Sequence, residues 1–206
     1  MLDLDETLIH YRDNSPDTQT EDESFLSTDN NNLNDTAISK KQNVSRLEES
    51  PPKLLTEEDE DEDVVFFIRP GLNSFLSQLN QYYELVLYTA ATREYADYFL
   101  RQIDHKNLFK NNILTREHCT FEGDYAIKDL RLLGRDLRKT IIIDNLKENF
   151  EKTTPDNGIH ISNFEGCFDD TELPKYENFL TRVALNEVDD VRDVIYEYRD
   201  KWETYE

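Results

Sequence analysis

The sequence predicts an α/β domain built on a parallel β-sheet with helices on both faces. Short apolar segments rich in β-branched residues alternate along the chain with segments whose apolar residues recur at helical spacing. Polar residues follow where several of the apolar strand segments end, which is typical of open sheets that bind ligands at the carboxyl ends of their strands. The length of 206 residues suits one such domain.

The elements are expected in the following order. The segments predicted as strands are short and apolar, and they are residues 2–4, 64–69, 84–88, 140–143 and 158–161. A β-hairpin is predicted for residues 119–127, because Glu122-Gly123-Asp124 interrupts this stretch with turn residues. The segments with helical apolar spacing are residues 72–79, 96–103, 176–183 and 191–202.

The charge of the chain is strongly negative and unevenly spread. The 45 acidic and 23 basic residues give a formal net charge of −22, which argues against electrostatic binding of nucleic acid or of an acidic membrane surface. Residues 13–63 hold 16 acidic and 4 basic residues and one aromatic residue, Phe25. We predict that 13–63 is a disordered acidic insert and that 1–12 and 64–206 form one domain.

Cysteine content and hydropathy narrow the class of protein further. The two cysteines, Cys119 and Cys167, indicate no disulfide framework and favour a reducing compartment. The apolar runs are too short to span a bilayer, so we expect no membrane span. No signal or transit peptide precedes Leu2, which argues against export or import of the chain as given.

Four polar features stand at the predicted strand ends. They are the pair Asp3 and Asp5, the hydroxyl of Thr89, Lys128 after the predicted hairpin, and Asp144-Asn145. Two carboxylates at this spacing could bind a divalent cation or divide the roles of nucleophile and general acid. Taken singly, the same residues could be a chance pair, a helix N-cap, a surface lysine and an ordinary turn. A parallel sheet would bring them to one edge.

In this order, the four features resemble the motifs of haloacid dehalogenase-type phosphatases. More narrowly, the chain resembles the FCP/NIF-like phosphatases that act on the C-terminal domain of RNA polymerase II. The segments that carry the resemblance are LDLDETLIH at 2–10, RPGL at 69–72, YELVLYTA at 83–90, KDL at 128–130, LGRDL at 133–137 and IIIDN at 141–145. The resemblance implies a haloacid-dehalogenase-like, three-layer Rossmannoid parallel sheet with a small β-hairpin insert.

The resemblance also implies catalytic roles. Asp3 would attack phosphorus and form an aspartyl-phosphate, and Asp5 would act as general acid and then as general base. Thr89 would hydrogen-bond the transferring phosphoryl oxygens, and Lys128 would neutralise their charge. These roles are physically consistent, because a carboxylate can approach an anionic phosphate only where cations offset the repulsion.

A cofactor and a substrate follow from the same resemblance. The residues assigned to Mg²⁺ are Asp3, Asp5 through its backbone carbonyl, Asn145 and the adjacent Asp144. The residues assigned to the substrate are Thr7, Tyr95 and Arg116. The last two could equally be a core tyrosine and a surface arginine.

We therefore expect a Mg²⁺-dependent protein serine/threonine phosphatase. Its expected partner is a phosphorylated, Ser-Pro-containing protein segment resembling the polymerase tail, bound by a nuclear or cytoplasmic monomer without direct contact to nucleic acid. An enzyme acting on small phosphometabolites is disfavoured by the KDL–LGRDL signature at 128–137.

The alternative is a non-catalytic peptide-binding module. Residues 81–84 and 135–137, followed by 141–144, resemble the presequence receptor subunit of the mitochondrial inner-membrane translocase. Under this alternative the protein would be mitochondrial. The intact set of Asp3, Asp5, Thr7 and Asn145 favours the enzyme.

Overall fold

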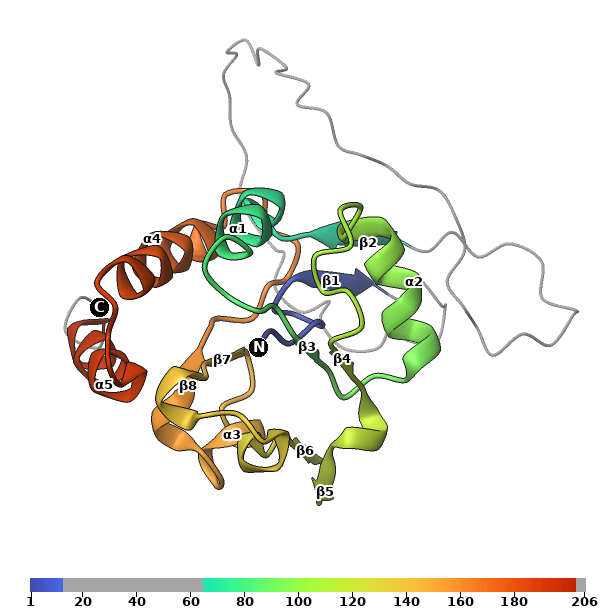
Figure 1. Ribbon diagram of the computed structural model, residues 1–206. Coiled ribbons are helices and arrows are strands. Elements are labelled where there is room, and N and C mark those ends of the chain that lie inside the picture. The colour runs from blue at the N-terminus through green and yellow to red at the C-terminus, as the bar shows by residue number, and fades with distance from the viewer. Residues whose placement is uncertain (13–64, 203–206) are drawn as a thin grey trace, which may run out of the picture.

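The fold is organised around a small parallel sheet, shown in the computed structural model in Figure 1. The structure describes residues 1–12 and 65–202. In the sheet, β3 (Leu87–Tyr88) pairs with β4 (Ile113–Leu114), and β7 (Ile142–Asp144) pairs with β8 (Gly158–His160). Leu2 bridges both pairs, to Leu87 on one side and Ile143 on the other. The predicted parallel sheet is therefore confirmed, with its first strand reduced to one bridged residue at the centre.

Main-chain hydrogen bonds explain how so short a segment holds the centre of the sheet. The N–H of Leu2 donates to Val86 (2.9 Å) and its carbonyl accepts from Tyr88 (2.8 Å). On the other side, the N–H of Asp3 donates to the carbonyl of Ile143 (3.0 Å). Asp3 therefore leaves the sheet at its carboxyl edge with its backbone fixed by a neighbouring strand.

Helices cover the sheet as predicted. The α-helices are α1 (Leu72–Leu79), α2 (Arg93–Ile103), α3 (Glu148–Glu151), α4 (Glu172–Leu185) and α5 (Val191–Trp202). The 3₁₀ turns are η2 (Arg116–His118), η3 (Leu130–Leu133), η4 (Leu137–Lys139) and η5 (Pro155–Asn157). Figure 1 shows α1, α2 and α4 on one side of the sheet and α3 with the β5–β6 hairpin on the other, so the sheet is the middle of three layers.

Neighbouring residues of β7 face opposite layers. Ile143 belongs to the large core with residues of α1, α2, α4 and α5. Ile142 packs instead with Leu130 and Phe150 in a smaller core. This alternation follows from the two-residue period of a strand, and it explains why Ile141, Ile142 and Ile143 are all apolar.

Two antiparallel pairs stand outside the sheet. The predicted hairpin is present as β5 (Thr120–Glu122) and β6 (Tyr125–Ile127), with Gly123 at a positive φ of 62° in its turn. The strand predicted at 64–69 is β2 (Val65–Ile68), but its partner is β1 (Ile9–Arg12), and it lies outside the parallel sheet. The predicted insert at 13–63 lies outside the described residues.

The helices are short or polar. In the part of the chain that the structure describes, none of them combines the length and the apolar character that a membrane span requires.

Candidate functional site

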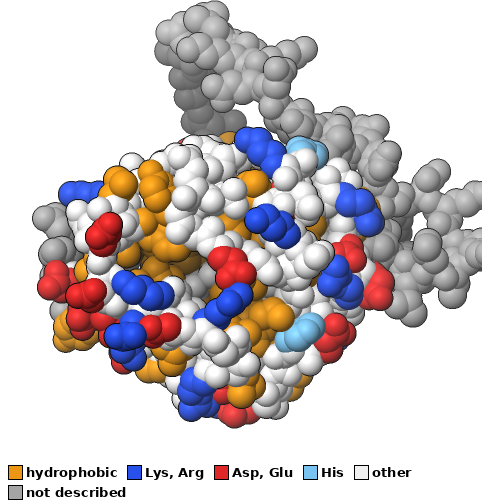
Figure 2. All heavy atoms as spheres, in the orientation of Figure 1, with side chains coloured by type: hydrophobic (Ala, Val, Ile, Leu, Met, Phe, Trp, Pro, Cys, Tyr) orange, Lys and Arg blue, Asp and Glu red, His pale blue; other side chains and the backbone are white. Residues whose placement is uncertain are grey.

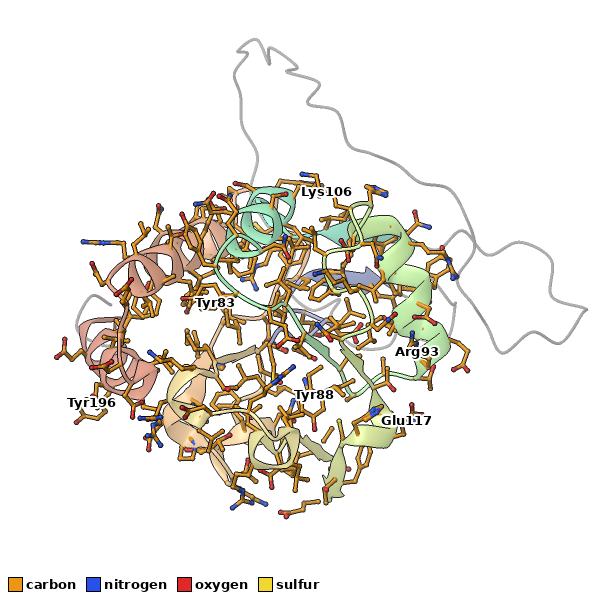
Figure 3. All side chains as sticks on the ribbon, in the orientation of Figure 1. Tyr83, Tyr88, Arg93, Lys106, Glu117 and Tyr196 are labelled. Carbon is orange, nitrogen blue, oxygen red and sulfur yellow. The ribbon has the colours of Figure 1, made fainter. Side chains whose placement is uncertain are left out.

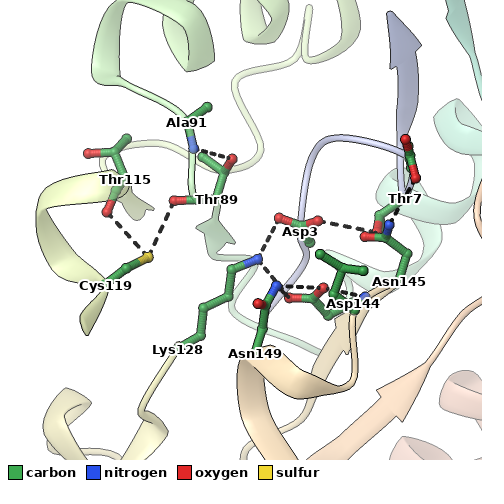
Figure 4. A network of polar contacts seen from close by, with 12 residues as sticks. Asp3, Thr7, Thr89, Ala91, Thr115, Cys119, Lys128, Asp144, Asn145 and Asn149 are labelled. Atoms are coloured by element: carbon green, nitrogen blue, oxygen red, sulfur yellow. Dashed lines mark hydrogen bonds and ion pairs between the residues drawn. The ribbon is translucent and has the colours of Figure 1, made fainter. Parts of the chain in front are cut away.

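The carboxyl edge of the sheet brings the predicted polar residues together. The ammonium Nζ of Lys128 lies 2.5 Å from Oδ1 of Asp3 and 2.7 Å from Oδ2 of Asp144 (Figure 4). All three residues are buried. Lys128 follows β6 directly, and its backbone N–H donates to the carbonyl of Asn149 (2.7 Å). The hairpin thus delivers the lysine to the point where the Leu2 segment and β7 end.

Burial and the charge of the ion-pair partner shift the pKa values of Asp3 and Lys128 in opposite directions. Burial raises the pKa of Asp3 to about 7, and the Lys128 ammonium opposes this rise. Burial disfavours the charged form of Lys128, but the carboxylates of Asp3 and Asp144 overcome that cost and raise its pKa. The lysine is therefore held as a cation at neutral pH.

Asp144 is engaged by donors from its own neighbourhood. Besides Lys128, its carboxylate accepts hydrogen bonds from the side-chain amide of Asn149 (3.2 Å to each oxygen) and from the backbone N–H of Leu146 (2.9 Å). These contacts make Asp144 a residue that positions Lys128.

Thr7 and Asn145 extend this network on the side of Asp3 away from the lysine. Oγ1 of Thr7 lies 3.5 Å from Oδ2 of Asp3 and 3.2 Å from Oδ1 of Asn145. The amide of Asn145 donates to Oε2 of Glu6 (3.3 Å) and to Oδ1 of Asn163 (3.2 Å). The contributions of Glu6, Asn149 and Asn163 were not predicted from the sequence. Only the place of Glu6 within the DLDET segment could have indicated its part.

Asp5 contacts an aromatic residue of α2. The hydroxyl of Tyr95 donates to Oδ1 of Asp5 at 2.5 Å. Burial raises the pKa of Asp5, while this hydrogen bond lowers it. Burial and the nearby Asp5 raise the pKa of Tyr95, so the phenol keeps its proton. Tyr95, which was predicted to bind the substrate, therefore contacts the carboxylate of Asp5.

Thr89 and Arg116 are placed differently. Thr89 is buried at the end of β3, and its Oγ1 accepts from the backbone N–H of Ala91 (3.0 Å), while its carbonyl lies 3.7 Å from Sγ of Cys119. Arg116 is exposed, and its guanidinium lies 5.5 Å from the ring centroid of Phe121 on the hairpin. Its guanidinium thus packs against the hairpin, while its backbone N–H donates to the carbonyl of Ala91 (2.9 Å).

A buried arginine fixes the loop that carries Asp3, Asp5 and Thr7. Arg69 donates from Nη1 to the carbonyl of Thr7 (3.2 Å) and from Nε and Nη2 to the carboxylate of Asp170 (3.0 and 2.8 Å). Glu6 adopts a positive φ of 56°, and its carbonyl accepts from Phe164 (2.7 Å). The RPGL segment therefore positions the site, a role that the sequence analysis did not assign.

The oxygen atoms of the site suit a hard divalent cation. Oδ2 of Asp3 and Oδ1 of Asn145 both accept from the hydroxyl of Thr7, so the two oxygens lie near each other. Carboxylate, amide and backbone carbonyl oxygens are the ligands that Mg²⁺ prefers. Across residues 1–12 and 65–202, no group of three or more His, Cys, Asp or Glu side chains has the geometry to hold a metal ion by itself. A cation here would therefore need Asn145 or a backbone carbonyl among its ligands.

Sequence relatives point to a translocase. The mitochondrial import inner membrane translocase subunits TIM50 of Debaryomyces hansenii and Candida glabrata are each 38% identical to the chain, over 133 and 135 residues. These matches cover 65% and 66% of this chain but only 28% and 27% of the relatives. The tim50 subunit of Emericella nidulans is 40% identical over 127 residues, 62% of this chain and 24% of the relative. The chain thus matches about a quarter of these relatives' length.

Two solved structures also resemble the chain. One is Fcp1, an essential RNA polymerase II CTD phosphatase, with 24% identity and a TM-score of 0.43 over 67% of this chain and 38% of that chain. The other is fission yeast Fcp1 bound to beryllium fluoride, with 21% identity and a TM-score of 0.47 over 97% of this chain and 53% of that chain.

These relatives correct the predicted function. The prediction of a Mg²⁺-dependent protein serine/threonine phosphatase that acts on polymerase-tail-like substrates is wrong, because the curated relatives at 35–40% identity are translocase subunits. The predicted nuclear or cytoplasmic location has no support from them. The physical reason is that the motif residues specify a buried polar network, and this network does not by itself determine which partner the domain binds.

The family, in contrast, was identified correctly from the motifs. The model of the NLI interacting factor-like phosphatase family matches residues 1–192, which include all the segments that carry the resemblance. The predicted α/β fold, with its parallel sheet and hairpin insert, is likewise confirmed. The chain belongs to the NLI interacting factor-like phosphatase family.

Proposed function

We propose that the chain is a peptide-binding module of a mitochondrial import translocase, and that it binds a basic segment of a partner polypeptide at the carboxyl edge of its sheet. The observation that carries this proposal is the charge of that edge. The carboxylates of four residues lie at this edge: Asp3, Asp5, Glu6 and Asp144. Among the described residues, Lys128 is the one cation that forms an ion pair with any of them. The names of the relatives support the translocase.

Two of the four carboxylates are accessible to a partner. Asp3 and Asp144 are buried, and both contact Lys128, whereas Asp5 and Glu6 are half-buried and have no ion pair in the described part of the chain. A lysine or arginine side chain that approaches the edge would therefore meet Asp5 and Glu6 first. The net charge of −22 would also speed the encounter with a basic segment at low salt.

The contact between Tyr95 and Asp5 fits a binding role. Oδ1 of Asp5 accepts a hydrogen bond at 2.5 Å from a phenol that keeps its own proton. This hydrogen bond fixes the orientation of the carboxylate and leaves Oδ2 to accept from a cationic side chain.

Mg²⁺ is part of the proposal as a competitor. Asp3, the backbone carbonyl of Asp5 and Asn145 would hold the ion, with water completing its shell. When bound, the ion supplies positive charge at the position where we place the basic side chain of the peptide. Mg²⁺ and the peptide are therefore expected to weaken each other's binding.

A fluorescence anisotropy titration tests the proposal. The probe is a labelled amphipathic helical peptide rich in arginine and lysine, and its control is the same peptide with glutamate in place of each basic residue. We expect the basic peptide to bind, and Asp5→Asn and Glu6→Gln each to weaken it about two- to tenfold. Glu197→Gln, an exposed position on α5, is the matched control and should bind like the wild type.

Two results would overturn the proposal. One is equal binding of the basic and acidic peptides. The other is hydrolysis of p-nitrophenyl phosphate that requires Mg²⁺ and is lost in Asp3→Asn, because a non-catalytic module has no such activity.

A further inference from the structure

One short segment of the chain contacts both loops of the carboxyl-edge site. It is the stretch 161–164, which directly follows β8. The backbone N–H of Phe164 donates to the carbonyl of Glu6 (2.7 Å). The neighbouring side chain, Asn163, accepts a hydrogen bond at its Oδ1 from the side-chain amide of Asn145 (3.2 Å). The loop that carries Glu6 and the loop that follows β7 therefore share one support.

The nitrogen and the oxygen of the Asn145 side chain both have partners. Its nitrogen donates to Oε2 of Glu6 (3.3 Å) and to Oδ1 of Asn163 (3.2 Å), and its oxygen accepts from the hydroxyl of Thr7 (3.2 Å). An amide turned the other way would place its oxygen against these two acceptor oxygens, which repel it. The two acceptors therefore keep Oδ1 of Asn145 turned toward Thr7, on the side of Asp3.

The two acceptors differ in charge. Glu6 is half-buried, and it is one of the two carboxylates that we expect an approaching cationic side chain to meet first. Asn163 is neutral, so such a side chain attracts it less. Asn163 can therefore hold the amide of Asn145 when Glu6 is engaged by another group.

We propose that Asn163 is a positioning residue, which holds the amide of Asn145 so that its oxygen, and not its nitrogen, faces a divalent cation bound at Asp3. The inference rests on the cation site of the proposed function, in which Asn145 is a ligand. Loss of a residue that orients a metal ligand from behind commonly lowers metal affinity about 10- to 100-fold. We expect the lower end of this range for Asn163, because Glu6 still holds the amide when Asn163 is replaced.

The amino edge of the sheet is not expected to compete for such a cation. A hollow of about 200 Å³ opens there, and Figure 2 shows it in the face in view, with hydrophobic side chains inside and charged ones at its rim. Its lining carboxylates, Glu84 and Asp136, are each paired with an arginine (2.8 and 2.7 Å). Tyr83, which lies close to α4 in Figure 3, donates its hydroxyl to the carbonyl of Leu180 (2.8 Å). The polar groups of this hollow are therefore already engaged.

Mn²⁺ binding to the full chain tests the inference without any peptide. Mn²⁺ prefers the same oxygen ligands as Mg²⁺, and electron paramagnetic resonance measures the free ion. Binding that persists in Asp3→Asn is the background from the other acidic residues of the chain. Above that background, we expect Asn163→Leu to bind Mn²⁺ about tenfold more weakly than wild type. Asn163→Asp, which keeps an acceptor oxygen, should bind it at least as tightly as wild type.

Asn178 provides the matched control. It is also an exposed asparagine, and its side chain donates to the carbonyl of Pro174 within α4. Asn178→Leu and Asn178→Asp should each bind Mn²⁺ like wild type, which separates the acceptor at position 163 from a general change of surface polarity or charge. Because Asn163 is exposed, we expect Asn163→Leu to fold like wild type.

The side-chain amide of Asn145 gives a readout that a loss of stability would not produce. In ¹⁵N–¹H spectra of the metal-free chain, we expect one of its two protons to move upfield in Asn163→Leu, because that proton loses its acceptor. In Asn163→Asp it should stay downfield. Without Mg²⁺, the basic peptide should bind Asn163→Leu and wild type equally, since Asn145 is not among its proposed contacts.

Three results would overturn the inference. They are a wild type that binds no Mn²⁺ above the Asp3→Asn background, Asn163→Leu that binds it like wild type, and Asn163→Asp that binds it as weakly as Asn163→Leu. None of these measurements involves the peptide. Failure of the basic peptide to bind would therefore contradict the proposed function and not the role of Asn163.

Discussion

The two edges of the sheet place charged groups in contrasting surroundings. At the carboxyl edge, the side chain of Lys128 is 0% exposed and lies between the carboxylates of Asp3 and Asp144. At the amino edge, Arg135 and Glu84 form their ion pair with side chains 56% and 50% exposed. A buried charge depends on its partners, because water cannot replace them, whereas an exposed pair exchanges readily with water or with a ligand. The ion pairs of the first edge are therefore buried within the fold, whereas the ion pair of the second is exposed to water.

The largest effect is expected from removal of the buried cation. Lys128→Met leaves the buried Asp3 and Asp144 without their cation and should lower the free energy of unfolding by about 3–5 kcal/mol. The matched change at the other edge, Lys139→Met, should alter it by less than about 0.5 kcal/mol, because that side chain is exposed. Urea unfolding of both variants measures the difference. Similar losses for the two would contradict the contrast between the edges.

A pH dependence of stability follows from Asp3. Burial raises its pKa from 3.8 to about 7 in the folded chain, so between these values the folded state binds a proton that the unfolded state has released. The stabilisation that the protonated carboxyl of Asp3 gives to the folded state is therefore complete below about pH 4, and it is lost as the pH rises through about 7. Melting temperatures of wild type and Asp3→Asn across this range measure it, and the variant should show the smaller decline. Parallel profiles would disprove the assignment.

The effect of removing one hydroxyl group can be compared at two buried threonines, one at each edge of the sheet. Thr7→Val removes a donor that faces Asp3 and Asn145, and it should cost about 1–3 kcal/mol, because charged acceptors are the more expensive to leave unpaired. Thr140→Val removes one hydrogen bond to the carbonyl of Asp136 and should cost about 1 kcal/mol. Chemical denaturation of the two variants measures which one loses more unfolding free energy. A larger loss at Thr140 would reverse the expected order.

The smallest effect is expected at the exposed ion pair. Glu84→Gln removes the partner of Arg135, but an exposed pair of this kind contributes less than about 1 kcal/mol. The melting temperature should change little, and the small difference from wild type should vanish in high salt. A large, salt-insensitive loss would show that this pair is part of the folded framework.

The carboxyl-edge network could be predicted from the sequence because parallel strands end at a common edge. Asp3, Thr89, Lys128 and Asp144-Asn145 each lie at or after the end of a predicted strand or hairpin. The structure brings Asp3 and Asp144 into direct contact with Lys128 and links Asn145 to Asp3 through Thr7. The β1 strand was missed because only four residues form it and its partner β2 is far away in sequence.

Other features depend on contacts that a linear pattern does not contain. Asn149 and Asn163 join the network from loops and a helix start whose positions are set by tertiary packing. The predicted enzyme function was wrong because the motif indicates the network, whereas the partner depends on surfaces around it.

The most direct test of the proposed function is the titration of the basic amphipathic peptide against wild type and Asp5→Asn, with and without Mg²⁺. The account predicts binding to wild type that Asp5→Asn and Mg²⁺ each weaken. Binding that neither the substitution nor the ion changes would show that the peptide does not use the carboxyl edge, and the account would then be wrong.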